Sequence, residues 1–360
     1  MSENTTPVYL NTAACGLIPP SVLEAGTRLY TGFETNSSAT AEHWRNVEQL
    51  RIKENIAGFI GAPPDSIALI PNFSFGLNSI VHALNGREKV LLYKKDFPSV
   101  YAPFVINQFD IVWLDDEDGF TIDLNKIESI IREQHINLIV ISHVQWQSGF
   151  KIDIKALCKL CRQHGVHTII DATQSLGAVD LQISETDPDV VLSSNYKWMN
   201  AGFGNGLLYM NPRFAAQYPA TITGMNSNTV HFTSNGFGFN GGVANYEPGS
   251  LNMFGCSILN RAVLEKKALG MAFIEQHNTA LTKKLVDALA TLPVSIVGPA
   301  TPDNRSSIVV LGDKNGLHTY LSQNNVITTG RNGLIRISIH YHNTEADIES
   351  AVHYISEGLK

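Results

Sequence analysis

The chain has 360 residues, of which 44% are hydrophobic and 16% are charged, and this is enough to bury a large core. The formal net charge of −7 and the lack of a long basic run argue against nucleic acid and anionic membrane as partners. No secretory signal and no apolar stretch of membrane-spanning length is visible, so a cytoplasmic protein is expected.

Short apolar runs, bounded by polar residues, predict strands at 66–70, 89–93, 136–144, 167–172, 189–194 and 206–210. Two of the intervening stretches, 123–135 and 153–165, have helical spacing of their apolar residues. Nearly continuous apolar strands that alternate with helices are typical of an α/β domain whose mainly parallel sheet is covered on both faces.

The amino-acid composition of the chain changes after residue 211. Residues 223–250 are rich in Gly, Asn, Ser and aromatics, and the segment is too long for a simple connection, which predicts a functional loop. A long helical stretch over 253–292 follows, then strands at 307–312 and 334–340, and a last helix over 344–359. We therefore expect a large domain over 21–244 and a smaller α+β domain made of 1–20 and 245–360.

The cysteines argue against disulfides and against a metal site. They are scattered, and Cys158 and Cys161 form a C-x-x-C pair within a helical pattern, with no second pair to complete a zinc site. His340 and His342 alternate in one strand but have no apparent third ligand. The segment "GFGNG" lacks the spacing of a dinucleotide-binding loop, so we predict neither a metal nor a dinucleotide.

Two residues at strand ends carry the chemistry. Asp171 ends the run "HTII", and Lys197 follows the next run, between Tyr196 and Trp198. Taken alone, Asp171 could simply cap a helix, and Lys197 could be a surface lysine after a strand. Ligands of open α/β sheets bind at the carboxyl ends of the strands, where such a pair suits pyridoxal phosphate. The lysine would form the Schiff base, and the acid would keep the pyridine nitrogen protonated.

The stretches 8–20, 142–211 and 333–348 together resemble the class V, fold-type I aminotransferase family. This family includes cysteine desulfurases, kynureninases, isopenicillin epimerase-like proteins and phosphoserine aminotransferases. The resemblance implies a large domain with a mainly parallel mixed sheet, a smaller α+β domain, and pyridoxal 5'-phosphate as cofactor. It also implies amino acid and keto acid substrates and a homodimer with the active site at the subunit interface.

The resemblance implies roles for individual residues around the cofactor ring. Lys197 matches the Schiff-base lysine and Asp171 the partner of the pyridine nitrogen. Gln174 matches the residue that hydrogen-bonds the phenolic oxygen, and Thr173 should pack near one face of the ring. Phe97 is similar to the kynureninase phenylalanine that stacks on the ring.

Further matches concern the phosphate of the cofactor. The backbone of Phe73 and the hydroxyl of Ser74 fit the phosphate-binding turn at a helix start. Tyr196 is similar to the kynureninase tyrosine that donates its hydroxyl to the phosphate, and Ser194 would be a second donor. Ser250 matches the residue that reaches the phosphate from the other subunit.

At the substrate end, Arg336 matches the arginine that binds the α-carboxylate. The planar guanidinium of an arginine can hold a carboxylate with two hydrogen bonds. Asn11 is expected in the same pocket.

The reaction is less determined than the cofactor. Aminotransfer is our first expectation, because it needs no further catalytic group. A kynureninase- or desulfurase-like lyase or hydrolase is the alternative, and an epimerase remains open. Residues 326–336 lack the desulfurase cysteine, Phe97 stands where desulfurases have His, and Val100 stands where kynureninases have an acid. A cofactor-free binding protein would have lost Lys197 or Asp171, and both are present.

Overall fold

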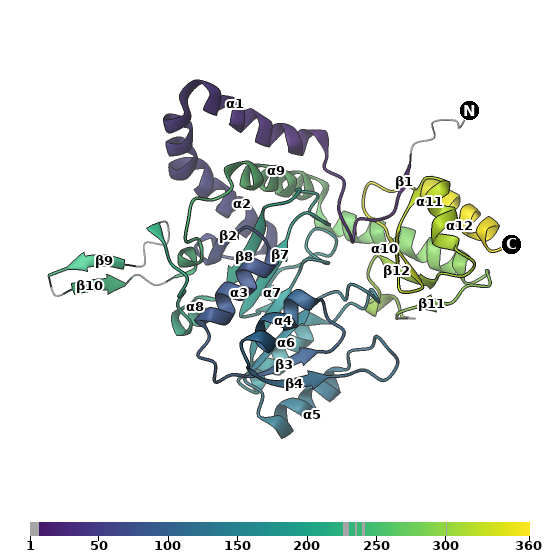
Figure 1. The fold of residues 1–360 in the computed structure, drawn as a ribbon, viewed down its shortest axis with the longest axis horizontal. Coiled ribbons are helices and arrows are strands. Elements are labelled where there is room, and N and C mark those ends of the chain that lie inside the picture. Colours follow the sequence, from purple (N-terminus) through teal and green to yellow (C-terminus); the bar gives the residue numbers. More distant parts are fainter. Residues whose placement is uncertain (1–6, 226–229, 235, 240–241, 300) are drawn as a thin grey trace.

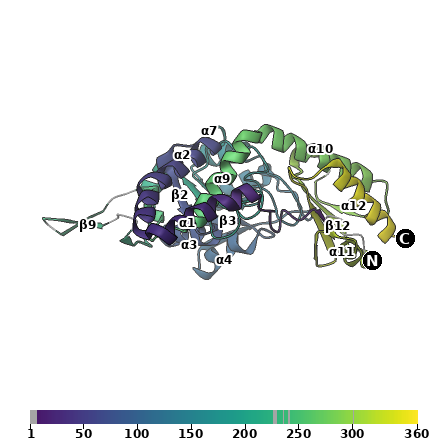
Figure 2. The same cartoon turned by 90° about the horizontal axis from the view of Figure 1, so that it is seen from above.

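The computed structural model describes residues 7–225, 230–234, 236–239, 242–299 and 301–360. A large α/β unit occupies one side of the molecule and a smaller unit, which holds the C-terminus, the other (Figure 1). Helix α10 (Met271–Leu289) runs along the molecule from the large unit to the small one (Figure 2).

In the described part of the chain, the central sheet has seven strands in the order β2-β8-β7-β6-β5-β3-β4. Only β8 runs antiparallel to its neighbours β2 and β7. The strands are β2 (Ile67–Ile70), β3 (Lys89–Tyr93), β4 (Asp110–Leu114), β5 (Leu138–Ser142), β6 (His167–Asp171), β7 (Val190–Ser194) and β8 (Gly206–Met210). Sequence patterning missed β4, because this edge strand buries only Leu114.

Both faces of the sheet are covered, as the apolar runs predicted. Alternate side chains point to opposite faces, so Ile67 and Leu69 belong to one core cluster and Ala68 and Ile70 to another. The helices of the first cluster are α1 (Pro20–His43), α2 (Gln49–Ile60), α5 (Leu124–Gln134), α6 (Ile154–Gln163), α7 (Ile183–Thr186), α9 (Met253–Leu269) and the first turn of α10. Those of the second are α3 (Phe73–Ala83), α4 (Pro98–Ile106) and α8 (Pro212–Gln217).

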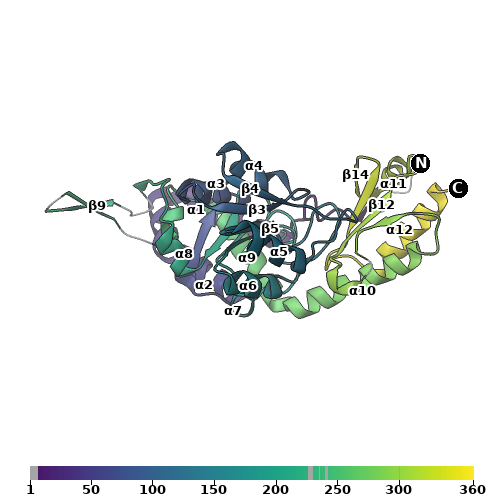
Figure 3. The ribbon, with the colours of Figure 1, turned by 90° about the horizontal axis from the view of Figure 1, so that it is seen from below.

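The small unit has a four-stranded antiparallel sheet in the order β11-β12-β15-β14. Its strands are β11 (Ile296–Val297), β12 (Ile308–Gly312), β14 (Thr329–Arg331) and β15 (Leu334–Ser338), and α11 (Leu317–Gln323) and α12 (Glu345–Gly358) pack with α10 over it (Figure 3). Near the N-terminus, β1 (Val8–Tyr9) pairs with β13 (Val326–Ile327), and Leu10 enters the core of this unit. We therefore propose that the segment from Val8 to Leu10 belongs to the small unit.

The long helical stretch predicted over 253–292 is two helices. Gly270 separates α9 from α10 with φ of 84°, a conformation that side chains disfavour. Helix α9 packs on α1 and α2, and its residues Ile258 and Leu259 lie in the core of the large unit. We therefore propose that the division between the units lies near Gly270 rather than between residues 244 and 245.

The predicted functional loop contains a hairpin of β9 (Val230–Thr233) and β10 (Gly236–Phe239), which projects from the large unit (Figure 1). Residues 226–229, 235, 240 and 241 of this segment lie outside the described residues. Its functional role stays a prediction. No helix in the described ranges has the length and apolarity needed to cross a membrane.

Candidate active site

Five loops meet at one edge of the central sheet. They follow β2, β3, β5, β6 and β7, which all run in the same direction. At this edge they line a cavity of about 470 Å³. The cavity gathers all the predicted cofactor-binding residues except Ser250, namely Phe73, Ser74, Phe97, Asp171, Thr173, Gln174, Ser194, Tyr196 and Lys197.

Asp171 and Lys197 are both buried in the cavity wall, with exposed fractions of 5% and 7%. Burial raises the pKa of the Asp171 carboxyl to about 6, and the charge of Lys197 partly opposes this shift. Burial lowers the pKa of the Lys197 amine to about 8, while the Asp171 charge raises it. The lowered pKa of the lysine therefore follows from its burial, and a larger fraction of the amine is neutral near pH 7 than in water.

A second buried acid, Asp96, lies beside Asp171 and was not predicted. It accepts hydrogen bonds from the Ser142 backbone N–H (2.8 Å) and hydroxyl (2.5 Å), and from Gln145 (3.3 Å). The same Ser142 hydroxyl lies 3.5 Å from Asp171 Oδ2, and the Asp96 charge adds to the raised pKa of Asp171. No local motif connects Asp96 with Ser142, because Asp96 lies in the turn after β3 and Ser142 ends β5.

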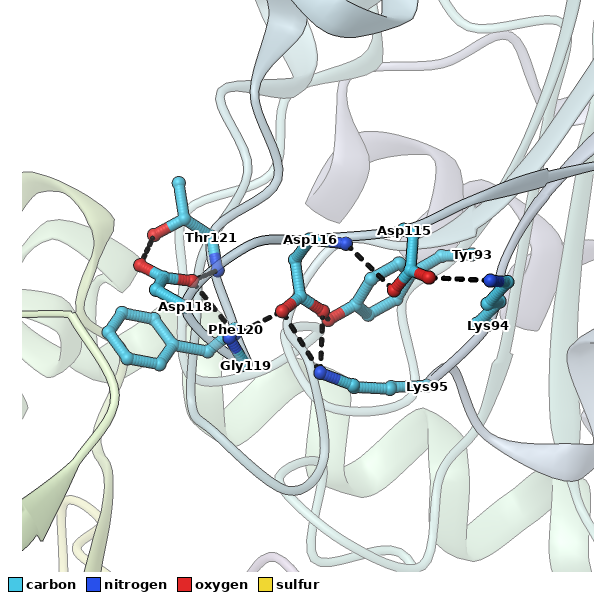
Figure 4. Close-up of polar contacts among 9 residues, drawn as sticks. All are labelled: Tyr93, Lys94, Lys95, Asp115, Asp116, Asp118, Gly119, Phe120 and Thr121. Carbon is cyan, nitrogen blue, oxygen red and sulfur yellow. Dashed lines mark hydrogen bonds and ion pairs between the residues drawn. The ribbon is translucent and has the colours of Figure 1, made fainter.

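The turn that carries Asp96 and Phe97 is held by a polar cluster after β3 and β4 (Figure 4). In this cluster Asp116 lies between Tyr93 and Lys95, and it accepts from the Tyr93 hydroxyl (2.7 Å) and the Lys95 amine (2.9 Å). An ion pair between Lys94 and Asp115 (2.5 Å) lies beside it. These contacts tie both lysines of "KKDF" to the loop after β4, which fixes the turn leading into α4.

One end of the cavity is suited to an anion. Helix α3 begins there, capped by Asn72, whose Oδ1 accepts from the Phe75 N–H (2.8 Å). The Phe73 N–H donates to the Ser194 hydroxyl (2.9 Å), and the hydroxyl of Ser74 lies 2.9 Å from that of Ser99. A helix start with nearby hydroxyls favours an anion, so Ser74 and Ser194 suit a phosphate. The Phe73 N–H, the predicted backbone donor, is already bonded to Ser194, so its contact with the phosphate stays a prediction.

Aromatic rings form the walls around Lys197. Its Nζ lies 5.5 Å from the ring centroids of both Phe97 and Tyr196. The Tyr196 ring stacks on Phe203 at 4.5 Å, and the Phe97 ring meets Trp146 edge-on at 5.5 Å. Phe203 and Trp146 were not predicted, because each comes from a loop whose path only the fold decides.

Gln174 lines the cavity, but its amide has partners within the protein. Its Oε1 accepts from the Trp198 indole (2.7 Å), and its Nε2 donates to the carbonyl of Ala13 (3.0 Å). The N-terminal segment also holds the lysine loop directly, since the Gly16 N–H donates to the Tyr196 carbonyl (2.8 Å). The proposed contact of Gln174 with the cofactor remains a prediction.

A second cavity of about 220 Å³ adjoins the first and shares Phe97, Trp146, Gln174, Tyr196 and Lys197 with it. Arg336 lines it from β15 and donates to the Trp146 carbonyl (2.9 Å). Asn11 is absent from the described lining, and its Oδ1 accepts from Thr329 (2.6 Å), which does line the cavity. A direct contact of Asn11 with substrate stays a prediction that this arrangement does not support.

Ser250 lies outside both cavities. It is exposed and lines a neighbouring hollow together with Pro71 and Gly204, which also line the cofactor cavity. Its role towards a second subunit stays a prediction.

His340 and His342 follow the end of β15 at Ser338, so the prediction that they alternate in one strand was wrong; His340 is fully buried. His340 Nε2 lies 3.1 Å from the amine of Lys266, and both groups contact Asn200. Burial lowers the pKa of both Lys266 and His340 well below their usual ranges. No cluster of three or more potential metal ligands occurs among the residues that the structure describes.

Comparison with known proteins gives consistent matches over the chain. The family model "Aminotransferase class-V" matches residues 8–350. A probable cysteine desulfurase of Methanothermobacter thermautotrophicus is 22% identical over 372 residues, which cover 95% of this chain and 92% of the relative. An uncharacterized aminotransferase of Bacillus subtilis, YcbU, is 23% identical, with 87% of this chain and 85% of the relative covered.

Solved structures match over nearly the full length. The apo cysteine desulfurase of Thermococcus onnurineus NA1 has a TM-score of 0.85 at 21% identity and covers 98% of this chain and 94% of its own. The complex of the cystine C-S lyase C-DES with cysteine persulfide has a TM-score of 0.86 at 19% identity and 98% coverage of both chains. These likenesses confirm the predicted fold class, a mainly parallel mixed sheet of fold-type I.

Proposed function

Because this chain belongs to the class V aminotransferase family, we propose that it is a pyridoxal-phosphate enzyme that acts at the α-carbon of an amino acid. When bound, pyridoxal phosphate supplies an electron-withdrawing ring that stabilises negative charge at the substrate α-carbon. The residues of the larger cavity fit this group, since the start of α3 and the hydroxyls of Ser74 and Ser194 suit its phosphate.

Asp171 and Lys197 fit the ring and the aldehyde of the cofactor. A carboxylate buried in the cavity wall can hold a proton on a ring nitrogen by a charge-assisted hydrogen bond. A buried lysine with a pKa of about 8 supplies a nucleophilic amine near neutral pH. The same amine lies where it can take a proton from the substrate α-carbon and return it as a general acid.

Arg336 binds the substrate α-carboxylate in the smaller cavity. Its Nη1 is already held by the Trp146 carbonyl, while its buried Nε has no acceptor within the described part of the chain. A carboxylate would satisfy this donor and orient the α-carbon towards Lys197, which lines the same cavity.

We favour aminotransfer among the reactions open to such an enzyme. The observation that carries this choice is the lining of the two cavities, which among the described residues contains neither a thiol nor an imidazole. Lys197 is then the group suited to move the α-proton, and aminotransfer needs no other.

A lyase reaction of the desulfurase kind is the second candidate, because several relatives carry the name cysteine desulfurase. The described cysteines argue against it, since Cys158, Cys161 and Cys256 are buried with their pKa raised to about 12. Cys15 is half-buried, does not line either cavity, and burial raises its pKa as well. None of these thiols is placed or activated as a nucleophile.

One experiment separates the two candidates. Holoenzyme is mixed with an L-amino acid and no acceptor, and the 2-oxo acid is measured over time. An aminotransferase releases one equivalent per subunit and stops, because the amino group stays on the enzyme, and an added 2-oxo acid restarts the reaction. Continued turnover on one amino acid, with release of alanine or another fragment, would replace aminotransfer by a lyase reaction.

We also propose a homodimer in which Ser250 completes the phosphate site of the partner subunit. The support is its exposed position beside Pro71 and Gly204, which line the cofactor cavity of its own subunit. Sedimentation of the holoenzyme, together with the cofactor affinity of Ser250→Ala, tests this assembly.

A further inference from the structure

One face of the β14–β15 hairpin points into the smaller cavity. Thr329 pairs with Arg336, and Arg331 pairs with Leu334, and all four residues line the cavity. Cross-strand partners lie on the same face of a sheet, and side chains two residues apart share that face. Ile335, which points to the opposite face, is buried in the core of the small unit. The pairing therefore brings two arginines to one wall.

The position of Arg331 is fixed by the turn and by a stacking contact. Asn332 and Gly333 form a two-residue loop with φ of 51° and 71°, as expected for a tight hairpin turn. The guanidinium of Arg331 lies 5.0 Å from the ring centroid of Trp146. Because Arg336 is the diagonal neighbour of Arg331, their backbones lie about 7–8 Å apart. Two long side chains with this spacing can each hold one end of a short molecule.

The cavity has positive charge without matching negative charge. Its described lining contains both arginines and Lys197 but no carboxylate. Burial, followed by the charge of Arg331, lowers the pKa of Arg336 to about 10. Two buried donors, Arg336 Nε and Trp146 Nε1, have no acceptor within the described part of the chain. Arg331 is exposed to solvent, and with an α-carboxylate on Arg336 its charge would still face no carboxylate in the described lining.

We propose that Arg331 and Arg336 form a two-anion subsite that selects amino acids with a short anionic side chain. The α-carboxylate binds Arg336, the side-chain anion binds Arg331, and Leu334 and Trp146 contact the methylene groups between them. This inference rests on the proposed function, and it names the substrate class of that same site. In aminotransfer the acceptor occupies the same cavity, so it would be a 2-oxo acid with a second carboxylate.

The subsite is tested first without the reaction. Isothermal titration of cofactor-free protein compares succinate, which has two carboxylates, with butyrate, which has one. The variants are Arg331→Met, Arg331→Lys and, as matched control, Arg213→Met, which removes an exposed arginine of α8. We expect Arg331→Met to weaken succinate binding about 10- to 150-fold, the range for one charge-assisted contact, and to leave butyrate unchanged. Arg331→Lys should recover part of the loss, and the control should match the wild type.

The second measurement is kcat/KM of the holoenzyme for L-aspartate, L-glutamate and L-cysteine sulfinate against L-alanine. Arg331→Met should reduce the values for the acidic substrates and spare that for alanine, and the ranking of the three identifies the anion. Equal succinate binding by wild type and Arg331→Met, or a wild-type preference for alanine, would overturn the subsite.

The failures of the two proposals can be told apart. Arg331-dependent succinate binding without turnover of any amino acid would retain the subsite and reject the proposed function. If amino acid turnover and succinate binding are both unchanged in Arg331→Met, the proposed function is retained and the subsite is rejected.

Discussion

Asp171 and Lys197 stand after neighbouring parallel strands, β6 and β7, and each shifts the pKa of the other inside one buried cavity wall. Asp171 is the last residue of β6, and Lys197 follows three residues after the end of β7. The acid and the amine are thus held at fixed positions by the sheet, and four predictions depend on this arrangement.

Lys197→Ala should abolish turnover and the covalent link to the cofactor. The cofactor should still bind, because the donors at the start of α3 and the carboxylate of Asp171 remain. Mass spectrometry after borohydride reduction measures the link, and the absorption spectrum follows the bound cofactor. Lys159→Ala, which changes an exposed lysine of α6, is the matched control. A reduced, covalently labelled Lys197→Ala protein would rule out the assignment.

Asp171→Asn should fold normally and lose the α-proton of the substrate far more slowly. An amide cannot hold a proton on the ring nitrogen as a carboxylate does, and a charge-assisted hydrogen bond is typically worth about 1.5–3 kcal/mol. This corresponds to a loss of about 10- to 150-fold. Exchange of the α-hydrogen in deuterated water gives the rate. Asp65→Asn, at an exposed acid just before β2, serves as the control, and an unchanged rate in Asp171→Asn would remove its role.

The stability of the cofactor-free protein should depend on Lys197 between about pH 8 and 10. Burial lowers the pKa of this amine to about 8 from 10.5, so in this window the unfolded chain binds a proton that the folded chain does not. The stability of the wild type relative to Lys197→Met therefore increases with pH, by at most about 1.4 kcal/mol per pH unit. Urea unfolding of both proteins at several pH values measures the difference. Parallel curves for the two proteins would contradict the shifted pKa.

Gly16→Ala should weaken cofactor retention although residue 16 does not line either cavity. A methyl group there would overlap the carbonyl oxygen of Lys197, so the lysine loop must move. Such overpacking typically costs about 1–3 kcal/mol of stability. Gly58→Ala on α2 is the control, because its methyl would meet only the flexible end of Lys267. Urea unfolding and the cofactor dissociation constant are the measurements, and wild-type values for Gly16→Ala would show that the loop adapts freely.

The sequence by itself determined the features that depend on local pattern and chain order. Short, nearly continuous apolar runs are typical of strands covered on both faces, so the sheet and the acid and lysine at its carboxyl edge were predictable. The same patterning failed at β4, where an edge strand buries only Leu114. The patterning also failed to predict that the helix ends at Gly270, because a single glycine leaves the helical spacing of its neighbours intact.

Only the tertiary structure decided which distant residues surround that pair. The Ser142 hydroxyl at the end of β5 links Asp96 to Asp171, and the loop after β7 folds so that the Phe203 ring stacks on Tyr196. Arg331 joins Arg336 on one wall because hairpin register sets which side chains share a face. Asp96 and Ser142 come from separate parts of the chain, and packing of the whole core brings their loops, the lysine loop and the hairpin to one site, so no short stretch of sequence contains this arrangement.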